Sequence, residues 1–208
     1  MRRFLFPVIA VAVALVSAAG CNGGGSKSTP AGSATAGPTP TVTLRAPGTG
    51  AVPVLTFTST AFANGALMPS GEAQLGCGGS NVSPDLSWSA GPPATQSYVL
   101  TEFDPDAPTG VGFWHWVLYN IGPSTTSIGL GAGTTPPSGI SGLNDYGALG
   151  YGGPCPPIGD GAHHYHFTIS ALDTVLTGMP ANATGAFVTF NMRGHVIAQG
   201  TYIGLFAR

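Results

Sequence analysis

Charged residues are scarce in this sequence. Only 7% of its 208 residues are charged, with six Lys and Arg against eight Asp and Glu. Without the first twenty residues, which carry Arg2 and Arg3, four cations face eight carboxylates. Binding to nucleic acid requires a basic patch that can meet the phosphate backbone, and this composition offers none. We therefore expect no nucleic-acid partner.

The common short motifs of catalytic and metal sites are also missing. The three cysteines form no Cys-x-x-Cys pair of the kind that holds structural zinc. There is no Gly-x-Ser-x-Gly segment that could present a nucleophilic serine. We expect neither a metal ion nor a cofactor, and we rank an enzymatic function below a binding function.

No apolar run is long enough to span a bilayer. The longest, Phe4 to Val16, follows Arg2 and Arg3 and precedes Ser17-Ala18-Ala19-Gly20, which is the layout of a secretory signal. Small residues directly before Cys21 resemble the lipobox of bacterial lipoprotein signals. We expect residues 1–20 to be a signal peptide and Cys21 to be lipidated, which would make the protein an exported, membrane-anchored lipoprotein at the cell surface or in the periplasm. Ordinary cleavage nearby is the alternative.

The composition changes again near Pro53. Residues 21–52 are mostly Gly, Ser, Thr, Ala and Pro and predict a flexible, lipid-anchored linker. Residues 53–208 have the length of one domain. Their short runs of β-branched and aromatic residues predict strands at 54–58, 86–88, 98–103, 114–121, 165–172 and 201–206. The pattern of residues 182–198 is ambiguous and favours a helix slightly over a strand. We expect a loop-rich, mainly β domain.

Two segments gather most of the ionisable side chains. The first is Asp104-Pro105-Asp106-Ala107-Pro108 with His115, and the second is Gly152-Gly153-Pro154-Cys155-Pro156-Pro157 with His163-His164-Tyr165. The prolines restrict the backbone around Asp104 and favour a preformed site. We expect Asp104 to bond His115, to raise its pKa and to leave its other ring nitrogen as a donor to an anion. A solvated turn and a packed histidine are the structural alternatives.

Alternation along a strand separates the three neighbouring histidines. It places His163 with Tyr165 on one face, and His164 with His166 on the other. Because these rings cannot all converge on one ion, alternation argues against a metal site. The unstructured sequence around Asn144-Asp145-Tyr146 is long for a compact domain, so we expect it to form one wall of a pocket.

These residues resemble the phosphatidylethanolamine-binding protein family, in particular its bacterial Raf-kinase-inhibitor-like branch. The resemblance runs from about Leu55 to Arg208. It is carried by Asn81-Val82-Ser83-Pro84, Asp104 to Pro108, Trp114-His115-Trp116, Gly150 to Pro157 and His163-His164-Tyr165. It implies a central antiparallel sheet packed on a smaller sheet, one or two helices near the C-terminus, and a small anion pocket at one end.

The resemblance also implies which residues bind the ligand. The pocket would use Asp104, Pro108, His115, His163 and Tyr165, with backbone near Cys155 and with Trp114 or Phe113 as a wall. Cys77 and Cys155 are the cysteines that remain after Cys21, and an exported chain meets an oxidising compartment, so a Cys77–Cys155 disulfide and two free thiols are both open.

Three functions follow, in order of preference. The first is a non-enzymatic module, tethered at a membrane, that binds a small phosphate- or carboxylate-bearing ligand or a phospholipid head group. The second is a protein-interaction or inhibitor module with a protein partner. The third is a hydrolase that uses Asp104 and His115 to activate water.

Overall fold

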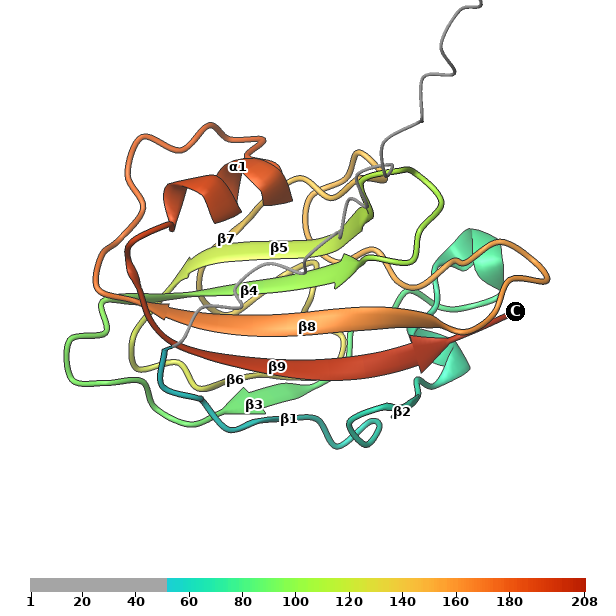
Figure 1. Cartoon of the computed structure of the whole chain (residues 1–208), viewed down its shortest axis with the longest axis horizontal. Helices are drawn as coiled ribbons and strands as arrows, with labels where there is room; N and C mark the ends of the chain where they lie inside the picture. Colours follow the sequence, from blue (N-terminus) through green and yellow to red (C-terminus); the bar gives the residue numbers. More distant parts are fainter. Residues whose placement is uncertain (1–51) are drawn as a thin grey trace, which may run out of the picture. The chain divides into compact units, whose positions relative to one another are not determined.

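The protein is described by a computed structural model over residues 52–208 (Figure 1). The predicted signal peptide, Cys21 and almost all of the predicted linker lie outside the described residues.

Two sheets build the domain, as predicted. The larger sheet has six strands in the order β2-β9-β8-β4-β5-β7, and the smaller has three in the order β1-β3-β6. All neighbours are antiparallel except β2 and β9. The strands are β1 Phe57–Thr58, β2 Ala66–Leu67, β3 Leu86–Trp88, β4 Ser97–Asp104, β5 Phe113–Ile121, β6 Ser127–Ile128, β7 Ile140–Ser141, β8 His163–Leu172 and β9 Val196–Phe206.

The large sheet is buried on both faces, because each face packs on a different layer. Tyr98 and Leu100 of β4 point to the core between the two sheets. The intervening Val99 belongs to a second core, where it packs with residues such as Val188 of α1, which spans Gly185–Asn191. All eight residues of β4 are therefore buried. Figure 1 shows α1 on the face of the large sheet opposite β1, β3 and β6.

The helix prediction for residues 182–198 is correct for α1 and wrong beyond it. The chain leaves the helix at Met192, and Gly194 adopts a left-handed φ of 83°. The next residues join β9, where Val196 pairs with Leu172 and Ala198 pairs with Ala171 of β8. Pairing with a buried neighbouring strand thus overrides the local helical preference. Two short 3-10 helices, Ser70–Glu72 and Leu75–Cys77, complete the fold.

Strand register brings the candidate site residues to one end of the large sheet. β4 ends at Asp104, which lies opposite Phe113 at the start of β5. β8 starts at His163, on the other side of β4. The same end of the sheet therefore receives side chains from three adjacent strands. None of the helices in residues 52–208 is long and apolar enough to cross a membrane.

Candidate functional site

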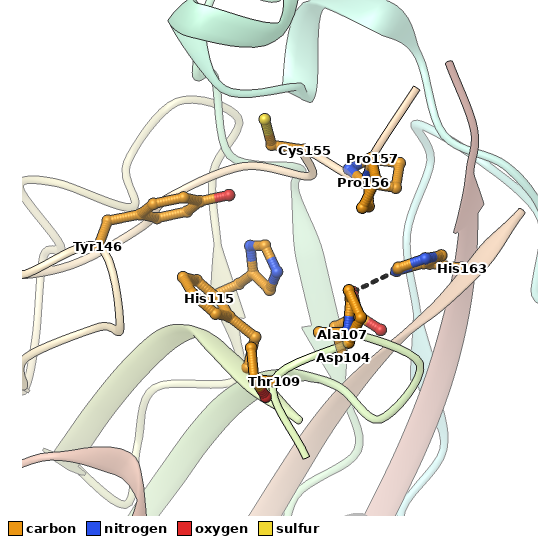
Figure 2. A pocket seen from close by; sticks show the side chains of 11 residues that line it. Asp104, Ala107, Thr109, His115, Tyr146, Cys155, Pro156, Pro157 and His163 are labelled. Atoms are coloured by element: carbon orange, nitrogen blue, oxygen red, sulfur yellow. Dashed lines mark hydrogen bonds and ion pairs between the residues drawn. The ribbon is translucent and has the colours of Figure 1, made fainter. Parts of the chain in front are cut away.

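A cavity of ≈ 180 Å³ opens at this end of the sheet (Figure 2). It is smaller than the roughly 300–1,000 Å³ of sites for drug-sized ligands, and it suits one small chemical group. Its lining comes from the β4–β5 loop, from strand β5 and from the loops that precede β8. The lining residues are Asp104, Ala107, Pro108, Thr109, Phe113, His115, Tyr146, Cys155, Pro156, Pro157 and His163.

Asp104 bonds His163, and not His115 as expected from the sequence. Its Oδ2 atom lies 2.7 Å from Nδ1 of His163, and its Oδ1 atom accepts the backbone N–H of Asp106 at 2.8 Å. Both oxygens of this buried carboxylate are therefore fixed. The register explains the difference, because Phe113 lies opposite Asp104 and His115 lies two residues further into the sheet. The Asp104–His163 bond is drawn as a dashed line in Figure 2.

His115 is held by backbone carbonyls. Its Nδ1 atom lies 2.7 Å from the oxygen of Gly152 and 3.2 Å from that of Gly153. Carbonyl oxygens only accept, so Nδ1 carries the proton and Nε2 carries the lone pair in the neutral ring. Burial lowers the pKa of His115 to about 4, although the Gly152 bond and the Asp104 charge oppose this shift. The expected rise in its pKa is therefore wrong, and His115 is a neutral acceptor at neutral pH.

Two tyrosines complete the surroundings of the imidazoles. Tyr165 does not line the cavity, but its buried ring packs edge-on against His115, with centroids 5.0 Å apart, and stacks near His163 at 6.4 Å. Tyr146 lines the wall opposite His163, and its hydroxyl donates to the Gly153 carbonyl at 3.1 Å. Burial raises the pKa of both hydroxyls. The sequence indicated the Tyr146 loop as a wall, but not this residue as a contact.

Trp114 does not line the cavity. Successive residues of a strand face opposite sides, so Phe113 and His115 reach the cavity while Trp114 points to the helix side. Trp114 instead lines a shallower groove with Phe103, Val111 and part of α1. Of the two aromatic walls expected from the sequence, Phe113 is the one at the cavity. Pro108 and Cys155 lie in the lining as expected.

The other histidines of β8 lie apart from the cavity. The exposed His164 bonds Asp106, with Nδ1 and Oδ2 2.7 Å apart. His163 and Tyr165 are buried while His164 is exposed, which confirms the predicted alternation. Within residues 52–208, no group of three or more His, Cys, Asp or Glu side chains is placed to hold a metal ion.

The Gly-Pro loop is fastened to the segment before Asn81. Cys155 forms a disulfide with Cys77, and their Cα atoms are 5.5 Å apart, a normal separation for bridged cysteines. The backbone N–H of Gly153 donates to Oδ1 of Asn81 at 2.8 Å. A side chain at position 153 would collide with the backbone of Glu72, so only glycine lets the loop approach this closely.

Comparison with known proteins identifies the family. A sequence model of the family described as phosphatidylethanolamine-binding protein matches residues 58–207. The chain is 44% identical over 129 residues to the UPF0098 protein YbcL of Escherichia coli K12, covering 60% of this chain and 70% of that protein. It is 39% identical over 160 residues to LppC of Mycobacterium tuberculosis H37Rv, which is named as a lipoprotein, covering 77% of this chain and 75% of LppC.

Solved structures agree with this assignment. The crystal structure of E. coli YbcL, described as a member of the mammalian PEBP family, superposes with a TM-score of 0.70 at 36% identity and covers 74% of this chain and 98% of YbcL. CT736 of Chlamydia trachomatis, described as a homologue of the same family, gives 0.65 at 34% identity with the same two coverages. This chain therefore belongs to the phosphatidylethanolamine-binding protein family.

Proposed function

We propose that this protein is a non-enzymatic module, tethered to a membrane surface, that binds a small anionic group in the cavity at the end of the large sheet. The group is a phosphate or carboxylate, either free or as part of a phospholipid head group. The observation that carries the proposal is the matched pair of imidazoles. His115 and His163 each have Nδ1 bonded to the protein, which leaves Nε2 of each ring for a ligand.

The two rings offer different chemistry to that ligand. Protonated His163 donates from Nε2 to an anionic oxygen, whereas neutral His115 accepts at Nε2. A phosphate group that retains one proton can satisfy both, since it has anionic oxygens and one hydroxyl. One or two charge-assisted hydrogen bonds of about 1.5–3 kcal/mol each, less the cost of ordering the ligand, support micromolar to millimolar affinity.

The cavity lining supports binding over catalysis. Thr109 and Cys155 are the lining residues whose side chains commonly act as nucleophiles. The Thr109 hydroxyl donates to the carbonyl of Gly112 at 2.6 Å, and the Cys155 sulfur is in the disulfide. The tether part of the proposal rests on the sequence before residue 52 and on the similarity to LppC.

Histidine-ring NMR tests the proposal. Inorganic phosphate and phosphoethanolamine are titrated into the mature protein while the ring signals are recorded. We expect saturable shifts of His115 and His163, and loss of saturation in His163→Ala. His164→Ala is the matched control, because His164 is adjacent in sequence but lies outside the cavity. If wild type shows no saturable shift, or if both variants lose it equally, the proposed site is wrong.

A second candidate function is docking of a protein partner in the groove lined by Trp114. Its rim exposes two large apolar side chains, Val111 at 71% and Phe190 at 68%. Apolar surface of this kind is a common feature of docking sites. Competition separates the two functions, because a partner that occupies the groove stays bound when phosphate fills the cavity.

A further inference from the structure

His163 lies between two carboxylates. Asp104 bonds its Nδ1 atom from below the cavity, and the Oδ2 atom of Asp160 lies 3.6 Å from its Nε2 atom. The second distance is too long for a good hydrogen bond but short enough for an ion pair with the protonated ring. The nitrogen that would meet a ligand thus already faces a negative group of the protein.

The two carboxylates are held very differently. The Asp104 side chain is 3% exposed and has a hydrogen bond at each oxygen. The Asp160 side chain is 46% exposed, and its carboxylate makes no hydrogen bond within the described part of the chain. Its backbone is in a turn closed by a 3.2 Å bond from its N–H to the Pro157 carbonyl. Asp104 is therefore a fixed partner of His163, whereas Asp160 can leave by rotation of one side chain.

The chain around Asp160 allows this movement. Gly159, with a φ of 89°, and Gly161 flank it, and an added side chain at either glycine would meet no other atom within 4 Å. Pro157 and His163, on either side of this short segment, both line the cavity. Asp160 is therefore attached to the rim of the cavity while its side chain has open space around it.

We propose that Asp160 is a built-in competitor, a carboxylate that occupies the anion-binding nitrogen of His163 until a ligand displaces it. This inference rests on the proposed function and adds a residue that sets its affinity and selectivity. An incoming anion must replace Asp160 at Nε2 and then tolerate its charge nearby. Because that repulsion grows with ligand charge, Asp160 disfavours phosphate dianions more than it disfavours singly charged carboxylates.

The test is calorimetric titration of the mature protein with inorganic phosphate and with acetate at pH 7.5. We expect Asp160→Asn to bind phosphate roughly threefold to fivefold more tightly than wild type, the range for one partly exposed charge pair, and to gain less for acetate. Asp173→Asn is the matched control. It removes the same charge from a similarly exposed carboxylate, 43% exposed, that faces His195 at 2.9 Å and lies outside the cavity.

The outcomes separate the two ideas. Equal or weaker phosphate binding by Asp160→Asn, with saturable binding by wild type, overturns the competitor role and leaves the proposed function standing. The same gain in Asp173→Asn also overturns it, because the effect would then come from net charge alone. Absence of saturable binding in both wild type and Asp160→Asn overturns the proposed function and this inference together.

Discussion

Glu72 and Glu102 are buried carboxyl groups in the inter-sheet core. Their side-chain oxygens have no hydrogen-bond partner within residues 52–208, and the two residues are 2% and 0% exposed. Glu102 lies opposite Trp116, whose indole nitrogen is likewise unpaired. Burial, assisted by the charge of Asp85, raises the pKa of Glu72 to about 8. Burial and the charge of Glu72 raise that of Glu102 further, so both groups are neutral acids at pH 7.

The raised pKa of Glu72 predicts loss of stability at alkaline pH. A group whose pKa is higher in the folded than in the unfolded state stabilises fully below the unfolded value, near 4.5, and loses this contribution as pH rises through about 8. We expect the free energy of unfolding of wild type to fall by on the order of 3 kcal/mol between pH 5 and pH 9.

Urea unfolding at pH 5, 7 and 9 measures this dependence. Glu72→Gln cannot ionise, so its stability is expected to fall less over the same range, with the difference from wild type greatest at pH 9. Asp173→Asn serves as the control for removing an exposed carboxylate. Parallel pH curves for wild type and Glu72→Gln would show that Glu72 titrates normally.

At the scale of elements, α1 is positioned by its first residue. Gly185 packs directly against the Trp114 ring, and a Cβ atom there would overlap that ring. Trp114 in turn packs on Phe103, with ring centroids 4.7 Å apart. The contact therefore sets how closely the helix approaches strands β4 and β5.

Gly185→Ala is therefore expected to destabilise the fold. Alanine favours helices, so local propensity alone predicts a gain, but overpacking typically costs about 1–3 kcal/mol. Denaturant unfolding of the variant measures the balance. Gly129→Ala is the control, since its added Cβ would meet nothing within 4 Å and no positive φ is involved. Stabilisation by Gly185→Ala would mean that the helix shifts away from Trp114 at little cost.

The disulfide joins two loops that the strands do not connect. Cys77 and Cys155 are separated by 78 positions, so the bond closes a long covalent loop and restricts the unfolded chain. We expect the Cys77→Ser/Cys155→Ser double variant to lose about 3–4 kcal/mol of unfolding free energy. Reduction of wild type by dithiothreitol is expected to give the same loss and to leave the double variant unchanged. Two titratable free thiols in the mature, unreduced domain would contradict the bond.

At the scale of the whole molecule, a strongly acidic domain holds the proposed anion site. Residues 52–208 contain eight carboxylates, while Arg193 and Arg208 are their arginines and they contain no lysine. Anion binding must therefore come from local hydrogen bonds to the imidazoles and not from attraction by the overall charge. This agrees with a role for Asp160 in setting affinity, because one more or one less nearby negative charge matters at such a site.

Attachment through Cys21 is the prediction at this scale that lies outside the described residues. If Cys21 is lipidated, the full-length protein expressed in a bacterium sediments with membranes and carries the mass of a lipid modification at its N-terminus. Cys21→Ser is expected to move the protein to the soluble fraction, because a signal-type apolar run this short gives no stable span. Equal fractionation of both proteins would argue for cleavage without lipidation.

The sequence by itself determined the features that depend on near neighbours along the chain. Alternation of apolar residues located the long strands, and the same alternation separated His163 and Tyr165 from His164. The prolines around Asp104 indicated a rigid turn at a strand end. The family resemblance added the likely cavity residues from motif matches, including Pro108 and Cys155, which the structure places in the lining.

Tertiary structure alone decided which distant groups meet and how each is charged. His163 reaches Asp104 across 59 positions, and His115 bonds a loop 37 positions away, so local spacing could not assign these partners. The low pKa of His115 and the high pKa of Glu72 arise from burial, which exists only once both sheets are packed. Trp114 left the cavity and residues 196–198 joined a strand for the same reason: contacts between elements outweigh the weak preferences of a short segment.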